Sequence, residues 1–135
     1  MMQLTMTKDI KSIVIASHND GKVREIRSLL YPYGYKIISA KKLGINEPIE
    51  NGMTFSENSL IKSRNAAKKS GLVALADDSG LCVNSLNYRP GIYSARWAGK
   101  NKDFSMAMKK IQKLMEKNDL LSKYNRRAFF VCSLS

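Results

Sequence analysis

"SIVIASHNDGKVRE", residues 12–25, joins an apolar run to a polar loop and then to a helical pattern. The apolar beginning predicts a buried strand over residues 12–17. Asn19 or Asp20 can cap a helix that follows over about residues 21–31. A buried strand that leads through a short polar turn into a helix is typical of an α/β fold.

The remaining chain continues this alternation of strands and helices. We expect a strand at 35–40, a loop at 41–53, and a helix that a capping box of Thr54 and Glu57 opens and Gly71 closes. Two strands or a hairpin should follow at 72–76 and 81–86 around the turn DDSG, and then a loop at 87–99. Asp103 should cap a further helix, before a last buried strand at 128–135; the apolar stripe of this helix contains Phe104, Ala107, Met108, Ile111, Leu114 and Met115. This order predicts an α/β layer fold.

The length and composition are those of a folded protein with one domain, residues 1–135. No apolar run approaches the ~20 residues of a membrane helix, and the N-terminus does not read as a secretory signal. We therefore expect a cytoplasmic protein that does not bind a membrane. Cys82 and Cys132 lie in apolar surroundings without metal-like spacing, which predicts reduced core thiols.

The formal net charge of +12 favours a polyanionic ligand, either a nucleotide or a nucleic acid. Residues 100–135 carry this charge most densely. However, the lysines of 109–123 fall on the polar side of a predicted helix, where a solvated basic face is the simpler interpretation. The aromatic residues do not cluster with these lysines, so a nucleic-acid-binding module is the weakest hypothesis and no nucleic acid is expected as a partner.

The polar loop of residues 17–22 resembles a phosphate-binding loop but departs from the P-loop pattern G-x-x-x-x-G-K-[ST]. Gly21 and Lys22 are present, whereas Ala16 stands at the first glycine position and Val23 at the final hydroxyl position. A helix N-terminus with one ammonium group can still bind phosphate. The alternative is a well-capped turn whose Lys22 is a surface charge.

Asp77 and Asp78 follow an apolar run and precede Ser79 and Gly80. At the end of a strand two such carboxylates can hold Mg²⁺ or activate a water molecule, although they point to opposite faces if the strand continues. The alternative is an Asp-rich tight turn. Lys62 with Asn58 on the next helix, and Arg96 in the 87–99 loop, are weaker candidates for ligand contacts, and Glu50 by itself says little.

Four blocks taken together resemble the inosine/xanthosine triphosphate pyrophosphatases, in the order and spacing of that family. They are IVIASHNDGKVREIRSLL (13–30), ENGMTFSENSLIKSRNAAKKSG (50–71), ALADDSGLCVNSL (74–86) and PGIYSARWAG (90–99). The resemblance implies an α/β fold with a long mixed central sheet, a cleft between two lobes, and a homodimer. It also implies Mg²⁺-dependent hydrolysis of a non-standard purine nucleoside triphosphate (ITP, dITP or XTP) to the monophosphate and pyrophosphate.

The resemblance also implies a role for each matching residue. The triphosphate would be wrapped by the loop of Ser17, His18, Asn19, Asp20, Gly21 and Lys22, and Lys22 and Lys62 would neutralise its charge. Asp78 would be the general base and a metal contact. Glu50 and Asp77 would help to arrange the metal, and Ser79 would contact the substrate. These roles suit phosphoryl transfer, which depends mainly on positioning and charge neutralisation.

Several positions depart from the family pattern. The family often has Gly at His18, and it prefers small residues where Tyr88 and Arg89 stand. Its members also continue past residues 128–135 with segments that recognise the base and build part of the second lobe. We therefore expect a C-terminally truncated chain with an incomplete second lobe and weak or no activity by itself. The alternative is an inactive, nucleotide-binding remnant or one half of a split enzyme.

Overall fold

The computed structural model describes residues 11–120, 122 and 126–135, which divide into two compact units. The first unit contains the described residues up to Ile49, together with Ile61–Ala76. The second unit contains Glu50–Leu60 and the described residues from Asp77 onward. Helix α2 (Phe55–Ser70) therefore contributes its first turns to the second unit and the rest to the first.

The first unit is built on a parallel sheet with the strand order β2–β1–β3. The central strand β1 (Ser12–Ile15) pairs with β2 (Lys36–Ser39) on one side and with β3 (Val73–Leu75) on the other. Since the three strands run in the same direction, the segments that follow them emerge at one edge of the sheet.

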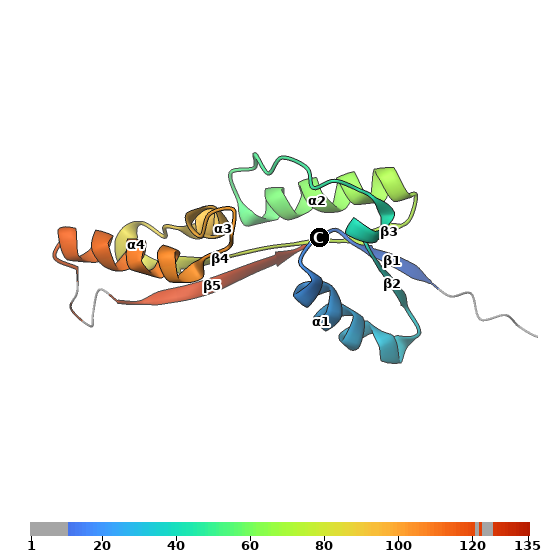
Figure 1. Cartoon of the computed structure of the whole chain (residues 1–135), viewed down its shortest axis with the longest axis horizontal. Helices are drawn as coiled ribbons and strands as arrows, with labels where there is room; N and C mark the ends of the chain where they lie inside the picture. Colours follow the sequence, from blue (N-terminus) through green and yellow to red (C-terminus); the bar gives the residue numbers. More distant parts are fainter. Residues whose placement is uncertain (1–10, 121, 123–125) are drawn as a thin grey trace, which may run out of the picture. The chain divides into compact units, whose positions relative to one another are not determined.

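Helices cover both faces of this sheet (Figure 1). Helix α1 (Asp20–Leu30) packs Val23 on one face, and α2 packs Ala66 on the other. Successive residues of β1 serve the two faces in turn, as the pleat of a strand requires. The α1 side of the core contains Ile15, Val23 and Ile37, and the α2 side contains Val14, Ala16, Ala40, Ile45, Ala66 and Ala76.

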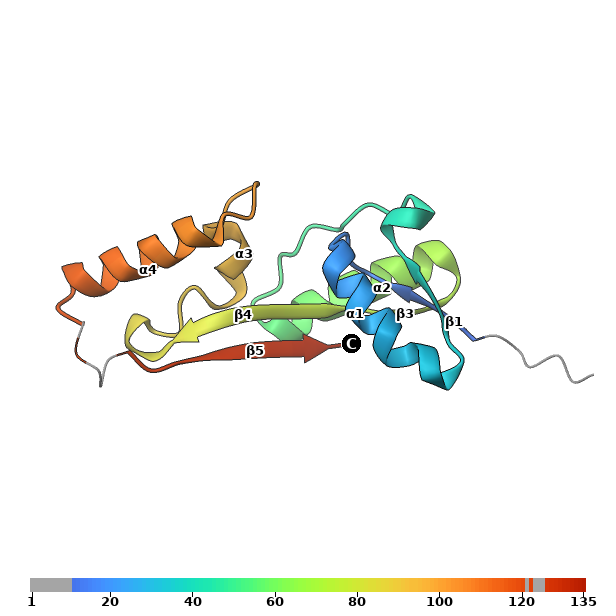
Figure 2. The ribbon, with the colours of Figure 1, turned by 60° about the horizontal axis from the view of Figure 1, so that its bottom comes forward.

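The second unit contains an antiparallel pair of long strands, which lie side by side in Figure 2. Strand β4 (Asp77–Val83) pairs along its whole length with β5 (Ala128–Leu134). Besides the first turns of α2, this unit contains the helices α3 (Ser94–Trp97) and α4 (Phe104–Lys117). Its buried core contains Val83, Leu86 and Met115.

Short 3-10 turns lie at Tyr31–Tyr33, Lys41–Leu43, Asn84–Leu86 and Gly91–Tyr93. The described helices include none that is both long enough and apolar enough to cross a membrane. The predicted α/β class, with helices flanking a parallel sheet, is confirmed, and so are the first two strands and the three long helices.

The predicted helix starts are confirmed in their chemistry. Asn19 caps α1, and Asp103 caps α4 by accepting from the Met106 N–H. At α2 the Thr54 hydroxyl accepts from the Glu57 N–H at 3.1 Å, but the Glu57 carboxylate accepts from the Met53 N–H rather than from Thr54. The expected capping box is therefore present with its second bond shifted by one residue.

The predicted DDSG turn is wrong, because residues 77–80 are the first part of β4. Strands β3 and β4 do not form a hairpin with each other, since β3 joins the parallel sheet and β4 pairs with β5. Asp, Ser and Gly favour a turn locally. Here pairing with a distant strand outweighs that preference, as tertiary context often does for strands.

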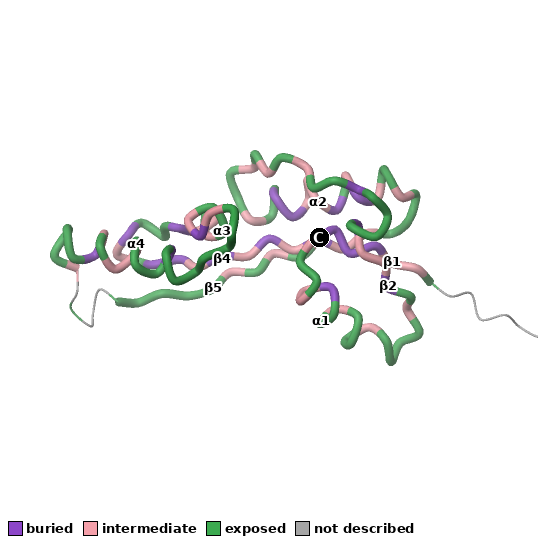
Figure 3. The backbone as a smooth tube through the Cα atoms, in the orientation of Figure 1, coloured by how far each residue is buried: buried purple, intermediate pink, exposed green. Residues whose placement is uncertain are grey.

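The expectation of a buried last strand is also wrong. Figure 3 shows β5 as largely exposed, and 81% of the surface of Phe130 is exposed to solvent. Cys82 is buried as predicted, whereas Cys132 on β5 is exposed. The apolar stripe of α4 is likewise narrower than expected, because Phe104 and Met108 are exposed while Ala107 and Met115 are buried.

Candidate active site

The loop after β1 is organised by the side chain of Asn19. Its Oδ1 atom accepts hydrogen bonds from the N–H groups of Gly21 at 2.9 Å and Lys22 at 3.3 Å. The Asn19 N–H donates to the Ser17 hydroxyl at 3.1 Å. The predicted turn is therefore well capped, and two of the N–H groups that a phosphate could have used already have an acceptor.

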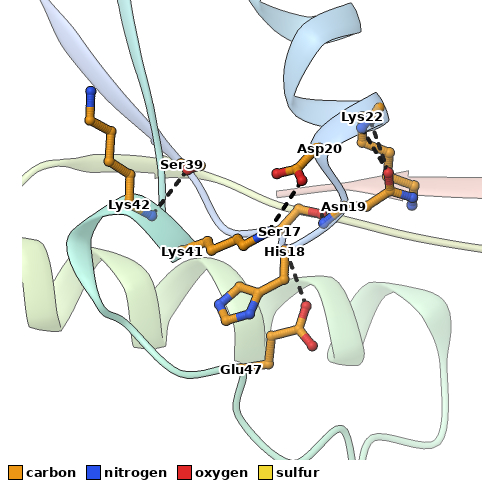
Figure 4. Close-up of polar contacts among 10 residues, drawn as sticks. Ser17, His18, Asn19, Asp20, Lys22, Ser39, Lys41, Lys42 and Glu47 are labelled. Carbon is orange, nitrogen blue, oxygen red and sulfur yellow. Dashed lines mark hydrogen bonds and ion pairs between the residues drawn. The ribbon is translucent and has the colours of Figure 1, made fainter. Parts of the chain in front are cut away.

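Asp20 places a negative charge in this loop, and Lys41 compensates it (Figure 4). The Lys41 Nζ atom lies 3.2 Å from the Asp20 carboxylate, and both side chains are more than half exposed. Such an exposed pair adds little stability. Its effect is to bring a second lysine to the loop that contains Lys22, which makes the surroundings more favourable for an anion.

His18 ties the same loop to the segment that follows Gly44. Its Nε2 atom lies 2.8 Å from the Ile45 carbonyl oxygen, so this nitrogen carries the proton in that contact. Its backbone N–H donates to the Glu47 carboxylate at 3.2 Å. His18 and Lys62 also line one small pocket, together with Asn65, whose side-chain amide donates to the Asn46 carbonyl. The first unit thus brings His18 close to Lys62.

Asp77, Asp78 and Ser79 occupy the first three positions of β4 in the second unit. The predicted opposition of the two carboxylates is confirmed in the burial pattern, since Asp78 is 7% exposed and Asp77 and Ser79 are half-buried. The Ser79 hydroxyl donates to the Asp77 carboxylate at 2.8 Å, which fixes both groups on one face. Asp78 lies on the other, buried face.

The buried face around Asp78 is polar. Asp78 pairs across the ladder with Ser133, whose hydroxyl lies 3.4 Å from that of Ser59 on α2. Ser59 is fully buried. The first turns of α2 therefore cover the part of β4–β5 that carries Asp78, and they exclude bulk water from this carboxylate.

Glu50, the third predicted metal carboxylate, also belongs to the second unit and is half-buried. Among the described residues, no three His, Cys, Asp or Glu side chains gather closely enough to form a metal-holding group. The donor chemistry nevertheless fits Mg²⁺, which prefers oxygen ligands and usually takes one or two carboxylates, with phosphate and water supplying the rest. A buried carboxylate such as Asp78 also favours a cationic partner.

Sequence reasoning overlooked two groups near the predicted residues of the first unit. Lys41 lies two residues after the end of β2, so its position at the same sheet edge as residues 17–22 could have been inferred from the parallel order. Glu47 reaches His18 from a loop with no periodic pattern, and no sequence signal indicates this contact. In the second unit, the contact of Arg96 with the backbone of Glu50 was equally unpredictable.

A capped helix N-terminus near lysines, together with acidic residues on a strand, does not identify a function by itself, because one fold serves many functions. Comparison with known proteins therefore decides the family. The Ham1 family profile matches residues 13–135. The chain belongs to the Ham1 family. The resemblance inferred from the four sequence blocks is therefore confirmed.

Relatives of this Ham1-family chain include proteins named dITP/XTP pyrophosphatase. The one from Zymomonas mobilis is 56% identical over 124 residues, which cover 91% of this chain and 58% of the relative. The one from Rhodopseudomonas palustris is 51% identical over 122 residues, covering 90% of this chain and 58% of the relative. The chain thus spans less than two thirds of the length of these relatives.

Solved structures of Ham1 proteins have the same fold. A HAM1 protein from Coxiella burnetii superposes with a TM-score of 0.84 at 40% identity, covering 93% of this chain and 62% of that protein. The Staphylococcus aureus Ham1 protein gives a TM-score of 0.75 at 44% identity, with the same coverage of each chain.

Proposed function

We propose that this chain carries the triphosphate and metal chemistry of a Mg²⁺-dependent pyrophosphatase that hydrolyses ITP, dITP or XTP to the monophosphate and pyrophosphate. The observation that carries the proposal is the 56% identity to a dITP/XTP pyrophosphatase. The capped, lysine-bearing loop after β1 in the first unit and the buried Asp78 on β4 in the second unit each supply groups that this chemistry requires. Removal of non-standard purine nucleotides from the nucleotide pool would be its role.

In this proposal the loop of residues 17–22 binds the triphosphate. Ser17 and Asn19 shape the loop through their mutual hydrogen bond, and His18 anchors it to the Ile45 carbonyl. Lys22 and Lys62 neutralise phosphate charge as it spreads in the transition state. Gly21 has no side chain that would obstruct the approach of an anion to Lys22.

Asp78 is the proposed general base and accepts the proton of the attacking water. Its burial fits this role, because a water-excluded site strengthens electrostatic interactions with the reacting groups. Asp78 would also hold Mg²⁺ together with Glu50 and Asp77, and Ser79 would contact the substrate. Bound Mg²⁺ would neutralise charge on the phosphate oxygens.

Pyrophosphate release tests the proposal directly. The purified chain is incubated with Mg²⁺ and ITP, dITP or XTP. ATP is the control for the nucleobase, and the Asp78→Asn variant is the control for the protein. We expect release of pyrophosphate, rather than orthophosphate, from the first three nucleotides. Equal release by the wild-type chain and Asp78→Asn would overturn the proposal.

We also propose that the chain acts in the cytoplasm, as its composition and N-terminal sequence predict, and that it forms a homodimer, as the family resemblance implies. Light scattering after size exclusion tests the second point, because a dimer has twice the 15.2 kDa mass of the chain. A mass of one chain at micromolar concentration would contradict it.

A further inference from the structure

Arg96 holds the backbone of Glu50 in place. Its Nη2 atom donates to the Glu50 carbonyl oxygen at 2.6 Å, although 46 residues separate the two in sequence. Hydrogen bonds from a charged donor are short and roughly twice as strong as neutral ones. The same guanidinium lies 4.9 Å from the centre of the Tyr93 ring, which limits the orientations that it can adopt.

The first turn of α2 holds the other end of the same segment. Asn58, which is fully buried, accepts the Gly52 N–H on its Oδ1 atom at 2.8 Å, and Glu57 accepts the Met53 N–H at 2.6 Å. Gly52 fits so closely that a Cβ atom there would lie 2.7 Å from both Asn58 Oδ1 and Glu57 Cβ. The segment of residues 50–53 is therefore fastened at both ends.

The short helix α3 connects this segment to the strand that carries Asp78. The Ser94 hydroxyl accepts the Leu81 N–H of β4 at 2.9 Å and donates to the Gly91 carbonyl at 2.7 Å. Ser94 and Arg96 are two residues apart on α3. Through them, the backbone of β4 and the backbone of Glu50 are joined by a short series of hydrogen bonds within the second unit.

We propose that Arg96 is a positioning residue, which sets the place of the Glu50 carboxylate for the divalent cation through the Glu50 backbone. The inference rests on the proposed function, in which Glu50 and Asp78 are metal ligands. Groups that orient metal ligands typically change metal affinity by about 10–100-fold when they are removed. Arg96 thus contributes to the metal site by orienting Glu50, rather than by binding phosphate directly.

Binding of Mn²⁺ without nucleotide tests this role apart from catalysis. Mn²⁺ replaces Mg²⁺ so that free metal can be measured by electron paramagnetic resonance during titration of the purified chain. We expect Glu50→Gln to weaken Mn²⁺ binding, which assigns the signal to this site. Arg96→Met should then weaken it about tenfold.

Arg89→Met is the matched control. The Arg89 Nε atom also donates to a backbone carbonyl, that of Leu86, at 3.1 Å in the same unit, but this bond does not involve Glu50. Arg89→Met should change the Mn²⁺ affinity less than twofold. Gly52→Ala supplies a second variant that displaces the Glu50 segment without altering Arg96, and it should also weaken Mn²⁺ binding. Thermal unfolding establishes which variants are folded.

The outcomes separate this inference from the proposed function. Equal Mn²⁺ affinity of the wild-type chain and Arg96→Met, or of the wild-type chain and Gly52→Ala, would overturn the positioning role and leave the proposed function standing. A wild-type chain whose Mn²⁺ binding does not depend on Glu50 would overturn the metal part of the proposed function, and this inference with it. Loss of tripolyphosphate binding by Arg96→Met at unchanged Mn²⁺ affinity would show a direct phosphate contact and overturn the positioning role.

Discussion

Among the glycines of the chain, Gly80 in β4 has the least space for a Cβ atom. A Cβ atom at this position would collide with the Gly91 carbonyl oxygen and would lie 2.7 Å from Ser94 Oγ and 2.9 Å from a Phe55 ring carbon. The absence of a side chain lets the turn before α3 and the start of α2 approach the strand that carries Asp78. Glycine is needed here for close packing.

Gly80→Ala should therefore lower the free energy of unfolding by about 1–3 kcal/mol, and Gly80→Ser by more, since overpacking grows with side-chain size. Urea titration followed by circular dichroism measures both. Gly34 is the matched control, because it has a φ of +76° and open space around a Cβ atom. Gly34→Ala and Gly34→Ser should lower the free energy of unfolding by about the same amount. A Gly80→Ser variant no less stable than Gly80→Ala would contradict the packing argument.

The two cysteines differ in environment, and their reactivity should differ with it. Burial raises the pKa of the Cys82 thiol, so less of it is thiolate at pH 8 than in an exposed cysteine. Cys132 is exposed. We expect Ellman's reagent to modify one thiol rapidly in the folded chain and two after unfolding. Cys132→Ser should abolish the rapid reaction, and a rapid reaction that persists in this variant would contradict the assignment.

At the scale of elements, the N-terminus of α1 combines a structural cap with a proposed phosphate loop. Asn19→Ala removes the acceptor for Gly21 and Lys22 and should cost about 1 kcal/mol of stability. Asn19→Asp keeps an acceptor and should keep the stability, because aspartate caps as well as asparagine. Its added negative charge should weaken binding of tripolyphosphate about tenfold.

Calorimetry with tripolyphosphate and urea unfolding measure the two effects separately. Asp103→Asn is the control, because it exchanges the same two residue types at the cap of α4 in the other unit. It should leave both stability and tripolyphosphate affinity unchanged. Tripolyphosphate binding that Asn19→Asp does not alter would mean that this loop is not the phosphate site.

Elements with a local origin were predicted well. Helix α1 begins at Asp20 behind a cap of Asn19, one of the two expected candidates, and α4 begins after Asp103. Helix α2 ends at Ser70, just before Gly71, which has a φ of +70°. Caps and left-handed glycines depend on a few neighbouring residues, so the sequence contains the information. The assignment of DDSG failed because pairing with β5, more than 40 residues later in sequence, decides its conformation.

At the scale of the whole molecule, the main electrostatic feature is the excess of 23 Lys and Arg over 11 Asp and Glu. Repulsion among like charges destabilises the folded state, and salt screens it. We therefore expect the Tm to rise by about 3 °C between 20 and 300 mM NaCl, equivalent to roughly 1 kcal/mol. Differential scanning fluorimetry measures this.

A double variant, Lys109→Glu and Lys113→Glu, checks the cause. Each change replaces a positive charge with a negative one and lowers the net charge by two, so the net charge falls from +12 to +8. Both lysines are exposed on α4, and the salt effect should shrink in this variant while the fold is kept. A Tm that falls with added salt in the wild-type chain would show that attractive ion pairs dominate.

The α/β class, the helix caps, the family and the residues proposed for phosphate and metal all follow from the amino-acid sequence. These depend on periodicity, on local hydrogen bonding and on motifs that are continuous in the chain. Three features emerge only in the folded chain: β3 and β4 belong to different sheets, β5 and Cys132 are exposed, and Arg96 donates a hydrogen bond to the Glu50 carbonyl oxygen. Each of these depends on contacts between residues far apart in sequence, which local composition does not encode.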